Sequence, residues 1–365
     1  MKIIILGGSP SNFGGVETFC ERAKSALGSC SDRHDVTWLT TSTAYLNFSR
    51  LPGLLRGMAQ FARMRLDGAG VVWLQYVNLA DLGYLALGKL LGFRVVVTPH
   101  LGTNWRSQKS GPLRWLSRTL LGLADSIALL ARTQAEEISL PEHTPRVMIH
   151  TFLPADVLRD IPLRQHDGSL RLLHASRLSE AKGTFLVIDT AGMLRRQGTP
   201  FTVQIIGSAD EATVGGLQQA IASQELASKV ELVGFVAPDL LMERLREADV
   251  LVHLSSVDSY PLIMLEALAC GVFPIALDLA GARDIVSRFD GHIVSGEGAA
   301  EQAAAFLSAS DPDELRRRAH HQAQRVREAF GWERAAALLE EALSEASIQP
   351  RDALPAERAS QLDVS

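Results

Sequence analysis

The sequence predicts an α/β chain with two doubly wound parallel sheets, one in each half. Short, almost continuously apolar runs alternate with amphipathic stretches along the 365 residues, as strands alternate with covering helices in parallel α/β proteins. A stretch from residue 151 to 168 has mixed charges, two prolines and weak periodicity. It divides the chain into two parts of ordinary domain size.

Composition and charge narrow the class of protein. With 47% hydrophobic residues, 21% charged residues and a net charge of −5, the chain is globular, and we expect no nucleic-acid partner because such binders are usually basic. Cys20, Cys30 and Cys270 are too few and scattered for a disulfide framework or a metal cluster, which fits a reducing cytoplasm. The first apolar run is too short for a signal peptide. We expect no membrane span, because no apolar segment of about 20 residues lacks charges.

The first half begins with a strand from Lys2 to Leu6, a loop that includes Gly14 and Gly15, and a helix from Val16 to about Leu27. Glycines in this position let the backbone approach a ligand closely, although a flexible turn is the alternative. The spacing is not GxGxxG, so a dinucleotide site is not predicted. Further strands are expected at residues 35–40, 71–75 and 94–98.

His100 directly follows the strand predicted at 94–98. Parallel sheets place their ligands at the carboxyl ends of strands. A histidine there can contact a substrate hydroxyl or a developing charge. The alternative is an ordinary loop histidine.

Basic residues accumulate in the first half. The segment from Leu82 to Ala124 has no acidic residue, and the predicted helix from Arg50 to Arg65 carries four arginines beside leucine, methionine and phenylalanine. Trp105 and Trp115 lie within the acid-free segment. Basic amphipathic helices with aromatic residues bind anionic membrane surfaces, but helices that merely cover a sheet are amphipathic too. The missing acids slightly favour a membrane-facing or polyanion-facing surface.

The second half begins near residue 160. A strand from Arg171 to Ala175 leads into a loop that contains Arg177 and Lys182, and a helix follows from Gly183 to about Leu194. Two cations beside a helix start would neutralise a diphosphate. Equally, both could be solvated surface charges. Strands are then predicted at 201–207, 230–234, 250–254 and 273–277, with helices at 214–226 and 239–247.

Asp258 and Glu266 are eight positions apart, after the strand predicted at 250–254. Pro261 is suited to the first position of a helix that ends near Gly271. Asp258 would therefore precede a helix start, and Glu266 would lie inside the helix. This arrangement suits a phosphate site, whereas the alternative is a helix cap and a solvated helix residue. A turn is expected at Gly281, a long helix from Trp332 to about Ala346, and a disordered tail after it.

Four of these segments together resemble retaining glycosyltransferases of family 4, which have the GT-B fold. The segments are GGVE at 14–17, SRLSEAKG at 176–183, DSYPLIMLE at 258–266 and FGWE at 330–333. The resemblance extends to about residue 346 and is stronger in the second half. It implies two Rossmann-like domains that face a central cleft: an acceptor domain at 1–160 and a nucleotide-sugar donor domain at 161–330. A closing helix at 331–347 would return to the first domain, and a tail would follow at 348–365.

The resemblance also implies catalytic roles. Arg177 and Lys182 would hold the donor diphosphate and stabilise it as the leaving group. Asp258 would orient the transferred sugar, and His100 would lie near it. Glu266 would bind the ribose hydroxyls. The cations would take the place of a metal, so no metal or cofactor is expected.

The remaining implied contacts come mainly from the backbone. Gly14 and Gly15 would approach the diphosphate, and the loop at Phe235 and Val236 would hold the base. The backbone at the helix N-terminus would stabilise the phosphates, at Tyr260, Pro261, Leu262 and Ile263.

Three departures from the family pattern stand out. Asp258 occupies a position where glutamate is usual, the strand end at Gln75 lacks a common histidine, and His150-Thr151 replaces a common Asn-Gly pair. The resemblance implies a retaining, metal-independent transfer from a UDP- or GDP-sugar to a glycan acceptor. We expect a lipid-carrier-linked acceptor in cell-surface polysaccharide synthesis, at the inner face of the cytoplasmic membrane. The alternatives are a small soluble acceptor and a non-catalytic nucleotide-sugar-binding protein.

Overall fold

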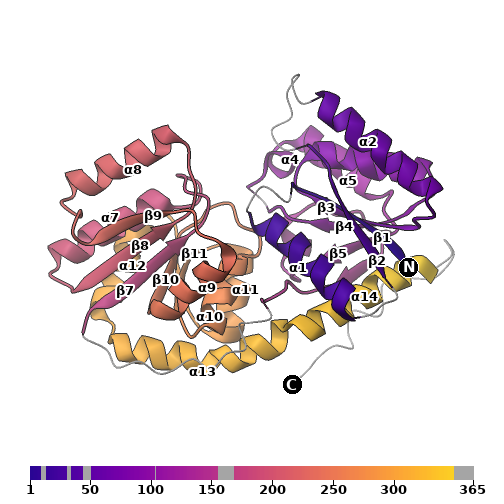
Figure 1. Ribbon diagram of the computed structural model, residues 1–365. Helices are drawn as coiled ribbons and strands as arrows, with labels where there is room; N and C mark the ends of the chain where they lie inside the picture. Colours follow the sequence, from indigo (N-terminus) through magenta and orange to yellow (C-terminus); the bar gives the residue numbers. More distant parts are fainter. Residues whose placement is uncertain (10–13, 31–33, 44–50, 103, 155–167, 349–365) are drawn as a thin grey trace. The chain divides into compact units, whose positions relative to one another are not determined.

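The computed structural model describes residues 1–9, 14–30, 34–43, 51–102, 104–154 and 168–348. The chain forms two compact units (Figure 1). Unit 1 contains Met1–Phe152 and the helix α14 (Trp332–Ile348), and unit 2 contains Leu153–Gly331. The boundary predicted near residue 160 lies within 155–167, outside the described residues, as does the tail after Ile348.

Unit 1 has a six-stranded parallel sheet in the order β2-β1-β3-β4-β5-β6. Its strands are β1 (Lys2–Gly7), β2 (Asp35–Thr40), β3 (Val71–Tyr76), β4 (Arg94–Pro99), β5 (Ser126–Leu129) and β6 (Arg146–Met148). Its other helices are α1 (Gly15–Cys30), α2 (Leu51–Leu66), the 3₁₀ turn η2 (Leu79–Asp81), α3 (Leu82–Leu90), α4 (Arg106–Lys109), α5 (Gly111–Leu121) and α6 (Gln134–Glu137). The predicted β1–β4 are confirmed to within one residue.

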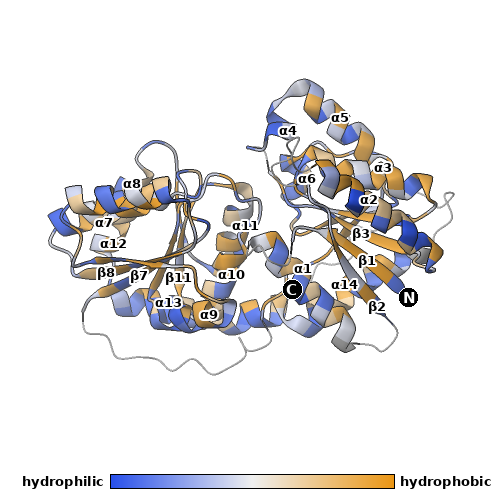
Figure 2. Ribbon diagram, turned by 45° about the horizontal axis from the view of Figure 1, so that its top comes forward, coloured by the Kyte–Doolittle hydropathy of each residue, from blue (hydrophilic) through white to orange (hydrophobic). Residues whose placement is uncertain are grey.

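Alternation along β1 explains how the two faces of this sheet are covered. Ile3 and Ile5 pack with residues of α1 and α14, whereas Ile4 and Leu6 pack with residues of α2, α3 and α5. Successive side chains of a strand point to opposite faces, so the apolar run is buried on both. In Figure 2 the strands β1 and β3 are accordingly largely orange.

Helix α14 completes the core of unit 1. Its buried residues are Ala335, Ala336, Leu339, Ala342 and Leu343, which is the spacing of one helical face. At its start, the ring of Trp332 contacts Phe152 with a centroid separation of 6.0 Å. The last described helix therefore folds with the first unit, although the whole of unit 2 separates it from Phe152 in the sequence.

Unit 2 repeats the plan with the strand order β12-β11-β10-β7-β8-β9, again all parallel. Its strands are β7 (Leu170–Ala175), β8 (Phe201–Ile206), β9 (Val230–Gly234), β10 (Val250–His253), β11 (Phe273–Leu277) and β12 (His292–Val294). Its helices are α7 (Thr184–Arg196), α8 (Glu211–Ser223), α9 (Pro238–Glu247), α10 (Leu262–Ala269), α11 (Ala280–Phe289), α12 (Ala299–Ala309) and α13 (Pro312–Phe330).

Two parts of the prediction need correction. Gly281 is not a turn but lies within α11, where the lack of a side chain serves packing, as described below. Ile348 belongs to α14 and not to the tail. The strands β5 and β12 and the helices α12 and α13 were not predicted, although α13 is 19 residues long.

Candidate active site

The carboxyl ends of β7 and β10 bring together two loops of unit 2. The strands are parallel neighbours, with Leu172 beside Val250 and Leu173 beside Leu251, so their ends lie at the same edge of the sheet. The loop after β7 (176–183) contacts the loop after β10 (254–261): the backbone N–H of Ser256 donates to the carbonyl of Ala181 at 2.9 Å, and its hydroxyl donates to the same oxygen at 3.1 Å.

Gly183 allows this close approach. It has φ +74° and is the N-cap of α7, and a Cβ there would lie 2.1 Å from the carbonyl oxygen of Leu254. A side chain would therefore suffer both an unfavourable backbone conformation and a backbone collision. The glycine thus keeps the neighbouring Lys182 beside the loop after β10.

Asp258 contacts both Lys182 and His253, one through each carboxylate oxygen. Lys182 Nζ lies 2.5 Å from Asp258 Oδ1, and His253 Nε2 lies 2.8 Å from Asp258 Oδ2. Burial by itself raises the pKa of Asp258, but the hydrogen bond and charge of His253 and the charge of Lys182 outweigh it and hold the pKa well below its usual range. Asp258 is therefore a carboxylate at neutral pH.

A second buried histidine, His174 of β7, ties the two loops together. Its Nδ1 lies 2.9 Å from the carbonyl oxygen of Val252, and its Nε2 lies 2.9 Å from Ser176 Oγ and 3.2 Å from Thr184 Oγ1. Because a carbonyl can only accept, Nδ1 carries the hydrogen. Burial lowers the pKa of His174 to about 4, so the ring is neutral at pH 7.

Neither His174 nor His253 was among the predicted site residues. Each is a histidine near the end of a strand that is otherwise apolar, LRLLHA and VLVH. A polar residue inside a buried strand must find a hydrogen-bond partner. Its position at the carboxyl end, where the ligand edge lies, was the available signal.

Helix α10 places Glu266 and the residues before it. Pro261 is the N-cap and not the predicted first residue, because its ψ of 104° is extended, so the helix begins at Leu262. The predicted end is confirmed by Gly271 with φ +73°. Because Pro261 is the cap, Asp258 does not cap this helix, and Glu266, which is 5% exposed, is not a solvated helix residue. The alternative interpretation of the two acids, as a helix cap and a solvated helix residue, is therefore wrong.

The segment between Asp258 and Glu266 packs on α11. A Cβ at Gly281 would lie 1.8 Å from the carbonyl oxygen of Ser259, so only glycine lets the helix start approach this loop. The hydroxyl of the buried Tyr260 donates to Asp284 Oδ2 at 3.3 Å. Burial raises the pKa of Tyr260, which keeps the phenol protonated. Backbone packing, and not a turn, therefore explains Gly281.

Arg177 lies in the loop after β7 and Phe235 in the loop after β9, so both are at the same edge of the sheet. Both are exposed, and Val236 is half-buried. Gly207, at the end of β8, donates its N–H to the carbonyl of Gly234 at 2.9 Å, and a Cβ at Gly207 would lie 1.7 Å from the carbonyl oxygen of Ser176. The loops after β7, β8 and β9 are therefore in contact.

Gly14, Gly15 and His100 belong to unit 1. Gly14 accepts a hydrogen bond from the N–H of Thr18 at 2.9 Å, and Gly15 is the exposed first residue of α1. His100 lies at the end of β4, with its Nε2 2.8 Å from Gln75 Oε1. Gln75 thus stands where the family pattern has a histidine. Burial lowers the pKa of His100 to about 3, so this imidazole is neutral.

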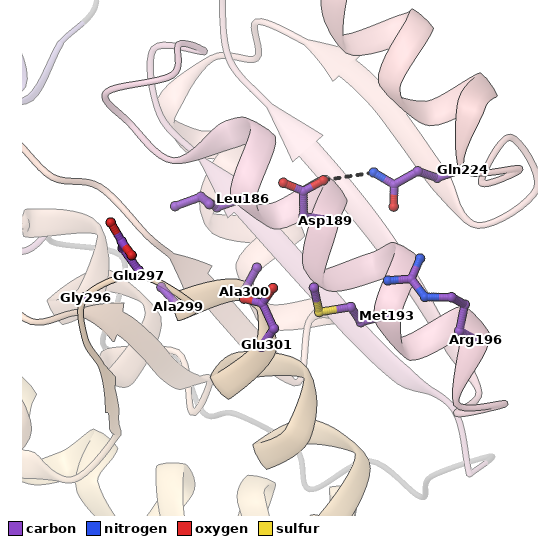
Figure 3. A pocket seen from close by; sticks show the side chains of 11 residues that line it. Leu186, Asp189, Met193, Arg196, Gln224, Gly296, Glu297, Ala299, Ala300 and Glu301 are labelled. Atoms are coloured by element: carbon purple, nitrogen blue, oxygen red, sulfur yellow. Dashed lines mark hydrogen bonds between the residues drawn. The ribbon is translucent and has the colours of Figure 1, made fainter.

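A separate pocket of about 380 Å³ lies on unit 2 (Figure 3). It is lined by α7, the end of α8 and the start of α12, and within it Gln224 Nε2 donates to Asp189 Oδ1 at 2.9 Å. None of the predicted site residues lines it. Within the described residues, no group of three or more His, Cys, Asp and Glu side chains could hold a metal ion. No helix in the same part of the chain is long and apolar enough to cross a membrane.

Comparison with known proteins places the chain among sugar-transferring enzymes. Residues 162–326 match the family described as Glycosyl transferases group 1. A D-inositol 3-phosphate glycosyltransferase of Pseudarthrobacter chlorophenolicus is 29% identical over 315 residues, which are 79% of this chain and 74% of the relative. The amylovoran biosynthesis glycosyltransferase AmsK of Erwinia amylovora is 35% identical over 149 residues, 38% of this chain and 35% of that one.

A solved structure extends the likeness beyond the matched segment. HepE of Anabaena, solved in complex with UDP and glucose, superimposes with a TM-score of 0.74 and 17% identity. The superposition covers 94% of this chain and 99% of HepE, and so includes both sheets. Residues 162–326 therefore match the group 1 glycosyltransferases, and the chain has the two-domain, Rossmann-like GT-B fold.

Proposed function

We propose that the protein transfers a sugar from a UDP- or GDP-sugar to a glycan acceptor, and that unit 2 binds the donor. The ion pair between Lys182 and Asp258 beside the start of α10 carries this proposal. It fixes a cation at the edge of the sheet where parallel α/β units bind phosphates. The UDP bound by the structurally similar HepE supports the same class of donor.

The chemistry requires a positive charge beside the leaving group. As the bond between the sugar and the diphosphate breaks, negative charge develops on the phosphate oxygens. Lys182 would stabilise this charge, with Arg177 reaching from the same loop. Glu266 would bind the ribose, and Phe235 and Val236 the base. In unit 1, we propose that Gly14 and Gly15 approach the phosphates and that the neutral His100 contacts the sugar.

We further propose that the transfer retains the anomeric configuration and needs no metal. Retention is supported by the likeness of the segments at 176–183 and 258–266 to retaining enzymes of family 4, and metal independence by the two cations of the first segment. NMR spectra of the first product would show the donor's anomeric configuration. EDTA would leave the rate unchanged. An inverted product, or a rate restored only by Mg²⁺ or Mn²⁺, would contradict these two points.

For the acceptor, we propose a saccharide on a lipid carrier in cell-surface polysaccharide synthesis. The likeness to an amylovoran biosynthesis enzyme supports it. A small soluble acceptor is the second candidate, which is favoured by the relatives named D-inositol 3-phosphate glycosyltransferases. Assaying one preparation with a lipid-linked saccharide and with inositol phosphate separates the two: the acceptor that supports turnover decides.

The apolar side chains exposed on α2 and α5 support peripheral membrane contact by unit 1. Leu54 and Phe61 of α2 are buried, and Trp105 packs on the core, so much of the predicted apolar face covers the sheet. However, Leu55, Leu66 and Trp115 are 59%, 87% and 67% exposed. The exposed Arg56, Arg63 and Arg114 lie on the same helices. Exposed apolar groups among arginines suit an anionic bilayer at the cytoplasmic face.

Thermal-shift measurements with UDP, GDP and their sugars test the donor proposal most directly. A ligand that binds the native state raises its melting temperature. We expect one nucleotide series to stabilise the wild type and to stabilise Lys182→Ala much less. If no member of either series raised the melting temperature of the wild type, the donor assignment would fail.

A further inference from the structure

The carboxylate of Asp258 is held at both oxygens, and none of the proposed donor-site roles uses the second contact. Lys182 holds Oδ1 and His253 holds Oδ2, at 2.5 and 2.8 Å. His253 is the last residue of β10 and only 4% exposed. A rigid strand, and not a loop, therefore supplies the second contact.

The hydrogen-bond pattern assigns the proton on His253. An ionised carboxylate only accepts, so Nε2 carries the hydrogen that Asp258 receives. His253 Nδ1 is buried and has no hydrogen-bond partner within the described part of the chain. The geometry thus places a hydrogen on Nε2, between His253 and Asp258.

We infer that His253 is a positioning residue of the donor site, acting through Asp258 on the ammonium of Lys182; the inference rests on the proposed function. A carboxylate held at one oxygen can still rotate about its Cβ–Cγ bond. The hydrogen bond from His253 removes that freedom.

The fixed carboxylate then sets the direction of the ammonium. Lys182 has three N–H groups, and Asp258 takes one of them at Oδ1. With that bond fixed, the other two are confined to the remaining tetrahedral directions, ready to meet a phosphate.

The short side chain at position 258 makes this contact possible. Asp258 has one methylene fewer than the glutamate usual in family 4. Its carboxylate therefore stays close to the strand end, within reach of His253. The histidine and the aspartate form a matched pair in this chain, and Asp258 serves the cation at least as directly as it serves the sugar.

A pair of near-isosteric substitutions tests the inference. His253→Gln keeps an N–H donor at a similar reach, whereas His253→Met has the same unbranched length without a donor. We expect His253→Met to lower kcat by about 10- to 100-fold, because small misplacements of catalytic groups cost up to about 100-fold. The donor KM should change by less than about 3-fold. His253→Gln should recover most of the loss, and His143→Met, at an exposed site of unit 1, should match the wild type.

Two further measurements separate positioning from general damage. In an Asp258→Ala background, His253→Met should change kcat by less than about 2-fold, since residues that act through one another are not additive. Long-range ¹H–¹⁵N NMR of the wild type should show hydrogen on Nε2 of His253. Equal losses in the Gln and Met variants, an unchanged kcat in His253→Met, additive effects with Asp258→Ala, or an Nε2 without hydrogen would each overturn the inference. If the wild type transferred no sugar, the proposed function would fail, and the NMR result would still decide whether His253 donates to Asp258.

Discussion

Lys182 Nζ and Asp258 Oδ1 lie 2.5 Å apart although 76 positions separate the two residues. The contact depends on the parallel pairing of β7 with β10 and on the close approach at Gly183. Both side chains are only about a quarter exposed, so the pair is screened less by solvent than a surface ion pair. The protein thereby holds one lysine charge at the edge where a diphosphate would bind.

Removing the ammonium should nearly abolish turnover. We expect Lys182→Ala to lower kcat by about 100-fold or more, the loss typical of removing one group that stabilises developing negative charge. Lys182→Arg should retain part of the rate because it keeps the charge but not the compact geometry. Steady-state kinetics with the donor identified by thermal shift provide the measurement. Lys229→Ala, at an exposed lysine of unit 2, is the control, and a Lys182→Ala rate equal to that of the control would exclude the assigned role.

Gly183 and Gly198 allow a matched comparison of backbone strain and collision. Their φ angles are +74° and +73°, but a Cβ at Gly198 meets no atom within 4 Å. Gly198→Ala should therefore cost only the left-handed conformation, about 1–2 kcal/mol of unfolding free energy. Gly183→Ala adds a collision with the carbonyl of Leu254 and should cost more, with a loss of turnover as Lys182 shifts.

Urea unfolding at pH 7, together with kcat, measures both variants. If the two alanine variants lost the same stability and kept the same rate, the close approach would have no role in placing Lys182.

Acid should destabilise unit 2 from about pH 6.5 downward through His174. The unfolded histidine binds a proton below about pH 6.5, whereas the buried ring binds one only near pH 4. Between these values the unfolded state holds more protons, so this contribution to stability is full above pH 6.5 and is lost as pH falls. The expected slope is about 1.4 kcal/mol per pH unit.

His174→Asn should flatten this slope, because asparagine can still donate to the carbonyl of Val252 but does not titrate. Circular dichroism follows both units, whereas fluorescence follows unit 1 alone, since the five tryptophans all lie there. We expect the variant to change the first signal and not the second. An unchanged pH slope in circular dichroism would refute the role given to His174.

Exposed apolar side chains on α2 and α5 should support binding to anionic vesicles. We expect the wild type to co-sediment with phosphatidylglycerol vesicles at low salt and less at high salt, because screening weakens its arginine contacts. A variant with Leu55, Leu66 and Trp115 changed to Ser should bind less, whereas Leu240→Ser, an exposed apolar residue of unit 2, should bind normally. If the wild type did not co-sediment with these vesicles at low salt, the proposed membrane contact would be wrong.

Much of the fold was predictable because strong local signals specify it. The strands β1, β3, β4 and β11 are apolar runs bounded by breakers, and the structure has them within one residue of the prediction. The three-residue β12 is too short to show periodicity. Gly281 was assigned to a turn because glycine's local preference was the visible signal, whereas its use depends on a contact with Ser259. Non-local packing overrode local propensity there.

The sequence by itself determined the two-sheet α/β architecture, the loop with Arg177 and Lys182, and the acid pair at 258 and 266, because periodicity and motif spacing are local properties of the chain. Only the tertiary structure decided that Asp258 is shared by Lys182 and His253 and that Glu266 is buried. Each of these depends on which strands pair and which faces meet. Those choices are made by packing between distant segments, and no local pattern of residues records them.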